Sequence, residues 1–408
     1  MDPDPAELRG FRALLTDEGQ GLLRSLAAYD PATALTEGAR LRSAGHPDHL
    51  VAAALTQARL RVRARPRLGA LADRLYLTPA GLEQLTRPEV ASRHAARFAA
   101  AADGRVLDLC CGVGGDLTAL AAAGLAVTGV DRDPLAVEVA RANLDVLGLG
   151  ARAEVRLGDI PGDLDVAGGL AGAGGLAGAA GVFVDPARRS GRGRALDPRS
   201  WSPPWGTVLD LAARVPATGV KAAPGLAHNA LPAGTEAEWV SVGGDVVECA
   251  VWWGPLGSGV ARRATLLPAG ATVSGGGTAR APAGPVGRFL HEPDGAVVRA
   301  GLVAEVADPL GATLLDPTIA YLSTPEPVAS PFLTSYEVVE VLPFHLKRLR
   351  ALLRQRGVGR LTVKKRGTAV TPEDLRQRLR LSGDEEATVV LTRVAGAQTV
   401  LLVEPLRR

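Results

Sequence analysis

Residues 106–116 read VLDLCCGVGGD, and this run constrains the fold more than any other part of the chain. It predicts a hydrophobic strand ending near a carboxylate, then a glycine loop, then a helix. Glycine lets the backbone approach a ligand where a Cβ would clash. The N-terminus of a helix offers N–H donors to an anion such as a carboxylate. We therefore expect a small-molecule binding site at this loop.

From about residue 103 the chain alternates short β-like runs with helical ones, which predicts an α/β fold. Such alternation implies a parallel sheet covered on both faces by helices, and ligands of such sheets bind beyond the carboxyl ends of the strands. The predicted strands are 105–109, 126–130, 153–157, 181–184, 218–222 and 238–242, and the predicted helices are 116–123, 134–147 and 208–214. A closing antiparallel hairpin is expected from 246–253 and 261–267.

The chain has 408 residues, which suits two or three domains rather than one core. Leucine and alanine recur at helical spacing near the start, so residues 1–100 are expected to form a helical domain. Residues 101–270 carry the α/β pattern. Residues 271–335, rich in Gly, Ala and Pro at their start, are interpreted as linker and connector. Residues 336–408 are expected to form a small α+β domain of order β-α-β-α-β-β.

Several classes of site are not expected. The three cysteines, Cys110, Cys111 and Cys249, contain no spaced Cys-x-x-Cys pair, so we expect neither a disulfide framework nor a metal site. The N-terminus lacks the basic start and apolar run of a secretory signal. The longest apolar candidate, residues 166–184, is Ala/Gly-rich and predicts a loop leading into a strand rather than a membrane span. We expect a cytoplasmic protein without membrane contact.

Carboxylates follow or end successive predicted strands, at Asp108, Asp131, Asp159 and Asp185. Asp131 lies nineteen residues after the first loop glycine, where an acid can accept both ribose hydroxyls. Asp159 is placed to accept from an adenine amine, and Asp108 suits a cationic amino group better than a phosphate. A dinucleotide fingerprint would need glycine where Leu117 stands, which disfavours a nicotinamide-dependent oxidoreductase. The predicted cofactor contacts are Asp108, Cys110, Gly112, Gly114, Asp131 and Asp159.

Two parts of the chain resemble known families. Residues 103–190 resemble a class I S-adenosylmethionine-dependent methyltransferase, and VLDLCCGVGGD is particularly similar to the trimethylguanosine-synthase branch. RLTVKKRG at 360–367, TPEDLRQRL at 371–379 and VVLTRV at 389–394 resemble the THUMP-like domain of a bacterial methyltransferase family, as does HEPDGAVVRAGL at 291–302. The resemblance implies a Rossmann-like methyltransferase sheet, S-adenosyl-L-methionine as cofactor, and RNA binding by residues 336–408. A tRNA and an rRNA are both open as substrates.

The run FVDPARR at 183–189 stands where amino-methyltransferases carry an acid or amide, two prolines and an aromatic residue. The resemblance implies that Asp185 and the Pro186 carbonyl hold an exocyclic amine. Ala187 replaces the second proline and Arg188 replaces the aromatic residue, although a guanidinium can also stack on a base or bind phosphate. We therefore expect Asp185, Pro186 and Arg188 to be catalytic and Arg189 to bind substrate.

The run SPPW at 202–205 matches that motif better by letter, but no strand precedes it, so we interpret it as a decoy. Trp201 and Trp205 are expected to pack rather than to stack on a base. Methylation at pyrimidine C5 needs a cysteine nucleophile, and no cysteine has a suitable context, so transfer to nitrogen is preferred. Lys221 ends the fifth predicted strand beside the expected substrate mouth. It is assigned to substrate binding, with a surface lysine as the alternative.

Residues 345–380 contain twelve Lys or Arg and two acids, a net +10 within a chain of net +3, so the remainder carries −7. A basic block on a mildly acidic body suits contact with a polyanion, and a solvated face is the alternative. The spacing of leucines and cations over residues 344–356 predicts a helix with a basic face opposite a leucine face. A basic strand follows, so we expect one continuous surface that contacts phosphates. Its predicted members are Lys347, Arg350, Arg354, Lys364, Lys365 and Arg366.

The sequence thus favours an RNA methyltransferase that acts on a base nitrogen. Two other readings stay open. One is a methyltransferase that acts on a small molecule or a protein, which predicts no RNA affinity for residues 336–408. The other is a non-catalytic RNA-binding protein with a relic cofactor fold. Residues 1–100 show no catalytic constellation, and their role is open.

Overall fold

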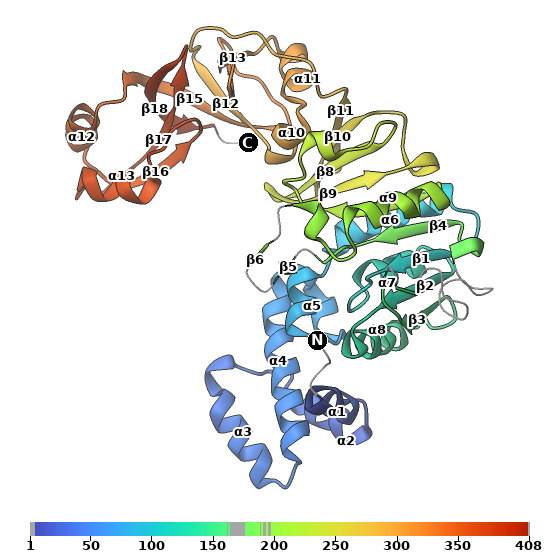
Figure 1. Ribbon diagram of the computed structural model, residues 1–408. Helices are drawn as coiled ribbons and strands as arrows, with labels where there is room; N and C mark the ends of the chain where they lie inside the picture. The colour runs from blue at the N-terminus through green and yellow to red at the C-terminus, as the bar shows by residue number, and fades with distance from the viewer. Residues whose placement is uncertain are drawn as a thin grey trace. The chain divides into compact units, whose positions relative to one another are not determined.

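The computed structural model describes residues 5–160, 162–163, 176–187, 189–190, 193–194 and 197–406. The chain divides into two compact units (Figure 1). One comprises Met1–Thr235 with Ala250–Ser258, and the other comprises Glu236–Cys249 with Gly259–Arg408. Among the described residues, no helix combines the length and the apolar character that crossing a membrane requires.

The described residues before the first strand are mainly helical, which confirms the expectation for this part of the chain. The Thr16 side chain accepts from the Gly19 N–H and so caps the second helix. The longest helix includes the Arg-rich stretch 59–67 and buries Leu50, Val51 and Leu60. The helices are α1 (Pro5–Leu14), α2 (Asp17–Ser25), α3 (Ala34–Ser43), α4 (Asp48–Leu68), α5 (Pro79–Gln84) and α6 (Pro88–Ala101).

A parallel sheet follows in the first unit, with the order β7-β4-β1-β2-β3. Leu109 pairs with Val130 on one side and with Val184 on the other, so the ends of three strands lie at one level of the sheet. The loops after those strands therefore meet at one edge. The strands are β1 (Val106–Leu109), β2 (Val127–Asp131), β3 (Ala153–Leu157), β4 (Gly181–Val184) and β7 (Thr218–Ala222).

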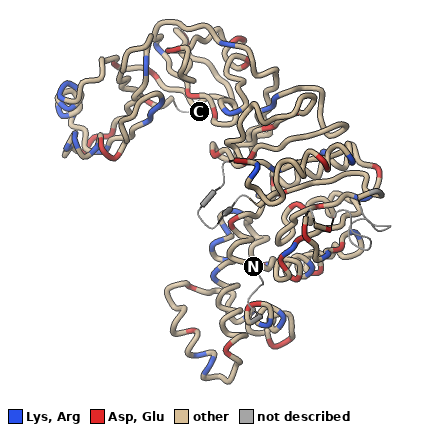
Figure 2. The backbone as a smooth tube through the Cα atoms, in the orientation of Figure 1, with Lys and Arg blue, Asp and Glu red and all other residues tan. Residues whose placement is uncertain are grey.

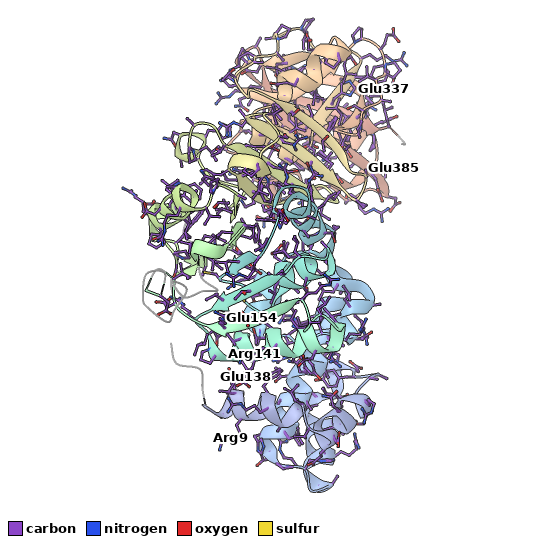
Figure 3. All side chains as sticks on the ribbon, turned by 90° about the vertical axis from the view of Figure 1, so that its right-hand side faces the viewer. Arg9, Glu138, Arg141, Glu154, Glu337 and Glu385 are labelled. Atoms are coloured by element: carbon purple, nitrogen blue, oxygen red, sulfur yellow. The ribbon has the colours of Figure 1, made fainter. Side chains whose placement is uncertain are left out.

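Helices α7 (Gly115–Ala122), α8 (Pro134–Leu147) and α9 (Trp205–Arg214) alternate with these strands. The Arg141 guanidinium of α8 donates to the Val155 carbonyl of β3, at 3.0 Å from Nε and 2.6 Å from Nη2. Figure 3 labels Arg141 near Glu154 of the same strand. Glu138 of α8 accepts from Arg12 of α1, where the two helices are in contact. The helical region is therefore packed directly on the sheet layer within the first unit.

In the second unit, β8 (Glu236–Val242) joins β9 (Asp245–Trp252), whose last residues belong to the first unit, through Gly243 and Gly244. Both glycines have positive φ, 61° and 91°, as a two-residue hairpin turn requires. The hairpin expected from 246–253 and 261–267 is wrong. Because the diglycine turn already pairs β9 with β8, β10 (Arg262–Leu267) lies on the other side of β8, parallel to it, and pairs antiparallel with β11 (Ala271–Gly275).

The segment expected as linker and connector is folded. Leu290 of β12 pairs with Tyr336 of β15 in a sheet of order β13-β14-β12-β15-β18-β17-β16. This segment contributes β12 (Phe289–Pro293), α10 (Gly295–Ala300), α11 (Val303–Ala307), β13 (Thr313–Asp316) and β14 (Ile319–Thr324). These three strands extend the C-terminal sheet beyond β15 and so pair an edge that would otherwise be open.

The C-terminal part has the element order expected from the sequence. Its leucine-rich helices cover one face of the sheet, where Leu349, Leu353, Leu375 and Leu379 are buried together. The elements are β15 (Leu333–Pro343), α12 (Leu346–Gln355), β16 (Val358–Lys365), α13 (Pro372–Leu379), β17 (Glu385–Val394) and β18 (Ala397–Pro405).

Candidate functional site

A cleft of about 200 Å³ lies in the first unit, beyond the ends of the parallel strands. The glycine loop and the residues after β2, β3 and β4 form much of its wall, as the sheet topology predicts. A further wall comes from a segment that precedes the first strand. The lining residues include Thr78, Gly81, Gln84, Cys110, Gly112, Val113, Asp131, Arg132, Asp159, Asp185, Ala187 and Ser202.

The glycine loop has a left-handed backbone at three positions, Cys110 at φ 62°, Gly112 at 55° and Gly114 at 90°. A Cβ added at Gly112 would meet nothing within 4 Å, so its backbone conformation, not space, is what favours glycine there. Cys110 adopts this uncommon conformation with a side chain, which indicates strain at the cleft. Burial raises the pKa of the Cys110 thiol, so the neutral form dominates.

Asp131 is held in place by two backbone amides. Its Oδ2 accepts from the Gly112 N–H at 2.8 Å, and its Oδ1 accepts from the Asp133 N–H at 2.9 Å. Burial raises the pKa of Asp131, while these two hydrogen bonds act in the opposite direction. Each oxygen keeps a lone pair, so the carboxylate can accept two hydroxyls from a bound ribose.

Asp159 lines the same cleft, whereas Asp108 does not. Asp108 is 1% exposed, and its Oδ2 is a buried oxygen without a hydrogen-bond partner. Burial raises its pKa well above the usual range, with Asp116 and Asp185 adding to the effect. A cationic amino group nearby would satisfy this oxygen. Together, Asp108, Asp131 and the glycine loop fit a nucleoside cofactor that carries an amino acid.

Lys221 binds Asp185, which follows β4 at the cleft. The Lys221 ammonium donates to Asp185 Oδ2 at 2.6 Å, to Thr86 Oγ1 at 2.8 Å and to the Gln84 carbonyl at 3.1 Å. Those three contacts use all three of its N–H donors. Lys221 is 5% exposed, so the surface-lysine alternative is wrong. These contacts hold the ammonium against Asp185, and the predicted role of Lys221 in substrate binding stays a prediction.

The hydrogen-bonded network continues away from the cleft. Thr86 Oγ1 donates to Asp116 Oδ2, and the Asp116 Oδ1 contacts His94 Nδ1 at 2.8 Å. Burial of Asp116 acts to raise its pKa, but the His94 and Lys221 charges and the hydrogen bonds outweigh it, and the pKa is lowered. The sequence analysis missed Gln84, Thr86 and His94. Their partners lie 22 to 137 residues away in sequence, and local periodicity carries no signal for such contacts.

The SPPW run lies directly against the Asp185 motif. The Ala187 N–H donates to the Ser202 carbonyl at 2.8 Å, and the Ser202 N–H donates to the Ala187 carbonyl at 3.0 Å. Trp201 and Trp205 are buried with their ring centroids 5.8 Å apart, so both pack, as expected. Pro186 is buried after β4. Arg188 and the side chain of Arg189 lie outside the described residues.

The basic C-terminal helix has the two faces that the sequence predicts. Leu349 and Leu353 of α12 are buried, while Lys347 and Arg354 are exposed. Much of α12 is blue in Figure 2, where Lys and Arg are coloured. The Arg354 guanidinium donates to the Arg380 carbonyl at 3.1 Å, and Arg350 donates to the Arg378 carbonyl.

The expected continuous basic surface is wrong. Lys364 binds Glu292 of β12 at 2.5 Å and lies 5.5 Å from the Tyr336 ring centroid. Tyr336 belongs to the core on one face of the sheet, whereas the α12 leucines pack with Leu361 and Val363 on the other. Side chains alternate along a strand, so Lys364 lies on the face away from α12. Arg366 also turns to this region, 3.7 Å from Glu292.

The described residues contain no group of three or more His, Cys, Asp or Glu side chains that could hold a metal ion.

Residues 106–170 match a methyltransferase domain, residues 333–405 a THUMP domain-like family, and residues 7–64 a domain of unknown function (DUF8688). Two relatives, each named an uncharacterized S-adenosylmethionine-dependent methyltransferase, come from Mycobacterium tuberculosis strains CDC 1551 / Oshkosh and ATCC 25618 / H37Rv. Each is 36% identical over 348 residues, which cover 82% of this chain and 90% of the relative. The crystal structure of a candidate methyltransferase from Porphyromonas gingivalis W83 covers 100% of both chains at a TM-score of 0.74 and 22% identity, which shows a shared fold.

Replacing Asp131 tests the cofactor wall of the cleft. Asp131→Ala removes the acceptor expected to bind two hydroxyls, so binding of S-adenosyl-L-methionine should weaken by about 1–3 kcal/mol, as for a lost charged hydrogen bond. Calorimetric titration measures this affinity. Asp145→Ala is the matched control, because Asp145 is exposed on α8 outside the cleft. Unchanged affinity in Asp131→Ala would reject this placement of the ribose.

Replacing Lys221 tests the buried ion pair. Lys221→Met leaves the Asp185 carboxylate without its cation, which should lower the free energy of unfolding by about 3 kcal/mol, the low end for a broken buried pair. Lys221→Met/Asp185→Leu should lose less than Lys221→Met alone, because no charge is then stranded. Tryptophan fluorescence reports mainly the first unit, since four of the five tryptophans lie there. Equal stability of Lys221→Met and the exposed control Lys347→Met would contradict the assigned role.

Proposed function

We propose that this chain, which belongs to the family of S-adenosylmethionine-dependent methyltransferases, methylates a base nitrogen of a structured RNA in the cytoplasm. The observation that carries the proposal is the Asp185 carboxylate, fixed by Lys221 at the cleft that also holds the glycine loop and Asp131. A tRNA and an rRNA are both candidate substrates.

Two acids that line the cleft and the buried Asp108 next to the glycine loop would each hold a different group of the cofactor. Asp131 would accept the ribose hydroxyls, Asp159 the adenine amine, and the unpartnered Asp108 oxygen the cationic amino group. When bound, S-adenosyl-L-methionine supplies an electrophilic methyl group on a sulfonium. Gly112 and Gly114 permit the left-handed backbone that the loop adopts at the cleft.

Asp185 is suited to orient an exocyclic amine. Lys221 binds Oδ2, and the two oxygens of a carboxylate together offer about four lone pairs, so Asp185 can also accept an amine N–H, while the Pro186 carbonyl can accept a second. This would direct the nitrogen lone pair toward the cofactor, and in-line positioning is the main demand of a methyl transfer. Asp185 also provides an acceptor for the proton that the methylated nitrogen releases.

Transfer to nitrogen rather than carbon is supported by the cysteines. Burial raises the pKa of all three thiols, Cys110, Cys111 and Cys249. A thiolate is the form that attacks a pyrimidine ring, and none of these thiols is readily ionised. Cys249 also lies within β9, in the second unit, rather than among the cleft residues.

RNA as substrate is supported by the THUMP-like C-terminal match and by the exposed cations of α12. A methyltransferase for a small molecule or a protein would leave these cations without a polyanion. A non-catalytic RNA-binding protein would have no use for the ordered set of Asp131, Asp185 and Lys221 around one cleft.

The acceptor site is tested by nucleoside mass spectrometry of total RNA from cells with and without the gene. One methylated nucleoside should disappear on deletion and return with the wild-type chain. Asp185→Asn should lower turnover by roughly 10²–10⁴-fold, as for lost proton transfer and positioning, with cofactor affinity near normal. Ser202 lines the same cleft, so Ser202→Ala is the matched control. Full activity of Asp185→Asn together with an inactive Ser202→Ala would show that the wrong motif was chosen.

RNA contact by the C-terminal domain is tested by salt dependence. Lys347, Arg354 and Lys365 are exposed. Replacing all three by Gln should reduce the slope of log affinity against log salt by about two to three, since each phosphate contact contributes roughly 0.7–0.9. Lys364→Gln/Glu292→Gln removes an ion pair without changing net charge and should leave the slope unaltered. Equal slopes for the triple variant and the wild type would make these residues a solvated face and favour a small-molecule or protein substrate.

A further inference from the structure

The helical region holds a second cavity of about 470 Å³, larger than the cofactor cleft of about 200 Å³. It lies within the first unit, and α2, α4 and residues 73–76 contribute to its wall. Part of this region matches a domain of unknown function. Its described lining contains four arginines, Arg24, Arg61, Arg65 and Arg74, and one acid, Asp73, a net +3.

The arginines of helix α4 lie on two different faces of the helix. Arg61 and Arg65 are one turn apart and line the cavity with Ala58 and Val62. Arg59 and Arg63 are exposed on the same helix and do not line the cavity. The arginine-rich run therefore supplies one set of cations to the cavity and another to solvent, and Figure 2 shows blue stretches along α4.

The acid in the lining does not balance these cations. Asp73 binds Arg65, at 3.0 Å from Nη2 and 3.1 Å from Nε. Arg61 donates through Nε to the Leu75 carbonyl at 3.3 Å and lies 5.6 Å from the Tyr76 ring centroid. Burial lowers the pKa of Arg61, and the opposing effects of Tyr76 and Asp73 do not offset it, so its charge is partly removed from water. Arg24 has no acidic partner among the described residues.

The cavity lining also contains a neutral hydrogen-bond donor, the Tyr76 hydroxyl, besides its arginines. The Tyr76 side chain is 3% exposed and lines the cavity. Its hydroxyl accepts from Gln20 Nε2 at 2.7 Å, and that Gln20 amide also donates to the Leu14 carbonyl. The tyrosine proton is therefore available to an anion. Guanidinium groups with a hydroxyl donor are the groups that recognise phosphate oxygens.

We infer that this cavity is a phosphate-binding site and that the phosphate it takes during catalysis belongs to the backbone of the RNA substrate. The first part stands on the cavity alone. The second part rests on the proposed function.

The backbone joins this cavity to the cofactor cleft. Tyr76 lines the cavity and Thr78 lines the cleft, so the two walls are two residues apart, at most about 7 Å of extended chain. Asn143 fixes this segment to the glycine loop, because its amide donates to the Tyr76 carbonyl at 3.0 Å and to the Val113 carbonyl at 2.9 Å. A phosphate bound here would anchor the RNA strand beside the reacting base.

The anion site is tested on the full-length chain with inorganic phosphate. Arg24→Gln/Arg61→Gln should weaken phosphate binding in calorimetric titration at least tenfold. Arg59→Gln/Arg63→Gln removes the same charge outside the cavity and should bind phosphate like the wild type. Tryptophan fluorescence melting confirms that both variants are folded. Equal phosphate affinity in the three proteins would overturn the site.

The source of the phosphate is tested with bulk tRNA. The cavity variant should show a slope of log affinity against log salt that is lower by about one to two, for two lost contacts of roughly 0.7–0.9 each, and the control variant should not. If the cavity variant loses phosphate binding but keeps the wild-type slope, the site serves a free phosphate compound and the RNA part is wrong. If the wild type binds no tRNA while phosphate binding still requires Arg24 and Arg61, the proposed RNA function fails and the anion site stands.

Discussion

The ion pair between Lys221 and Asp185 is the interaction on which the arrangement of the cleft depends. Lys221 lies on β7 and Asp185 follows β4, and the same ammonium binds Gln84 and Thr86, which precede the first strand. A buried ammonium is tolerated only when its charge and its donors are satisfied. The segment around Thr86 must therefore stay against the sheet, and this requirement makes the helical region a wall of the cleft.

The same residue type forms an ion pair, lines a cavity or faces solvent according to the face on which it lies. In the basic block, Lys364 is committed to Glu292, whereas Lys365, its neighbour in sequence, is exposed on the other face of the strand. In α4, Arg61 lines a cavity while Arg63 faces solvent. A count of cations along the chain cannot separate these roles. The separation follows from the period of two in a strand and of 3.6 in a helix, combined with what packs on each face.

In the C-terminal sheet, the domain boundary depends on which strands pair with one another, and the sequence alone does not reveal this pairing. The strands β12, β13 and β14 come from a segment rich in glycine and proline, and each is short, 4 to 6 residues. Such strands are weak signals in isolation, because a strand gains stability mainly from its neighbours. Their place is decided by β15, whose 11 residues offer an edge to β12 as well as to β18.

Local periodicity and turn residues predict the glycine loop, the parallel strands and helix α8, because these features depend on neighbours a few positions apart in the chain. The sequence also predicts which acids follow successive strands. Four features follow from tertiary contacts instead: Lys221 is buried against Thr86, Asp108 lies outside the cleft lining, β10 pairs with β8, and Lys364 and α12 lie on opposite faces of the sheet. Those outcomes depend on contacts between distant segments, and burial of charge and strand pairing set them, neither of which leaves a local pattern in the chain.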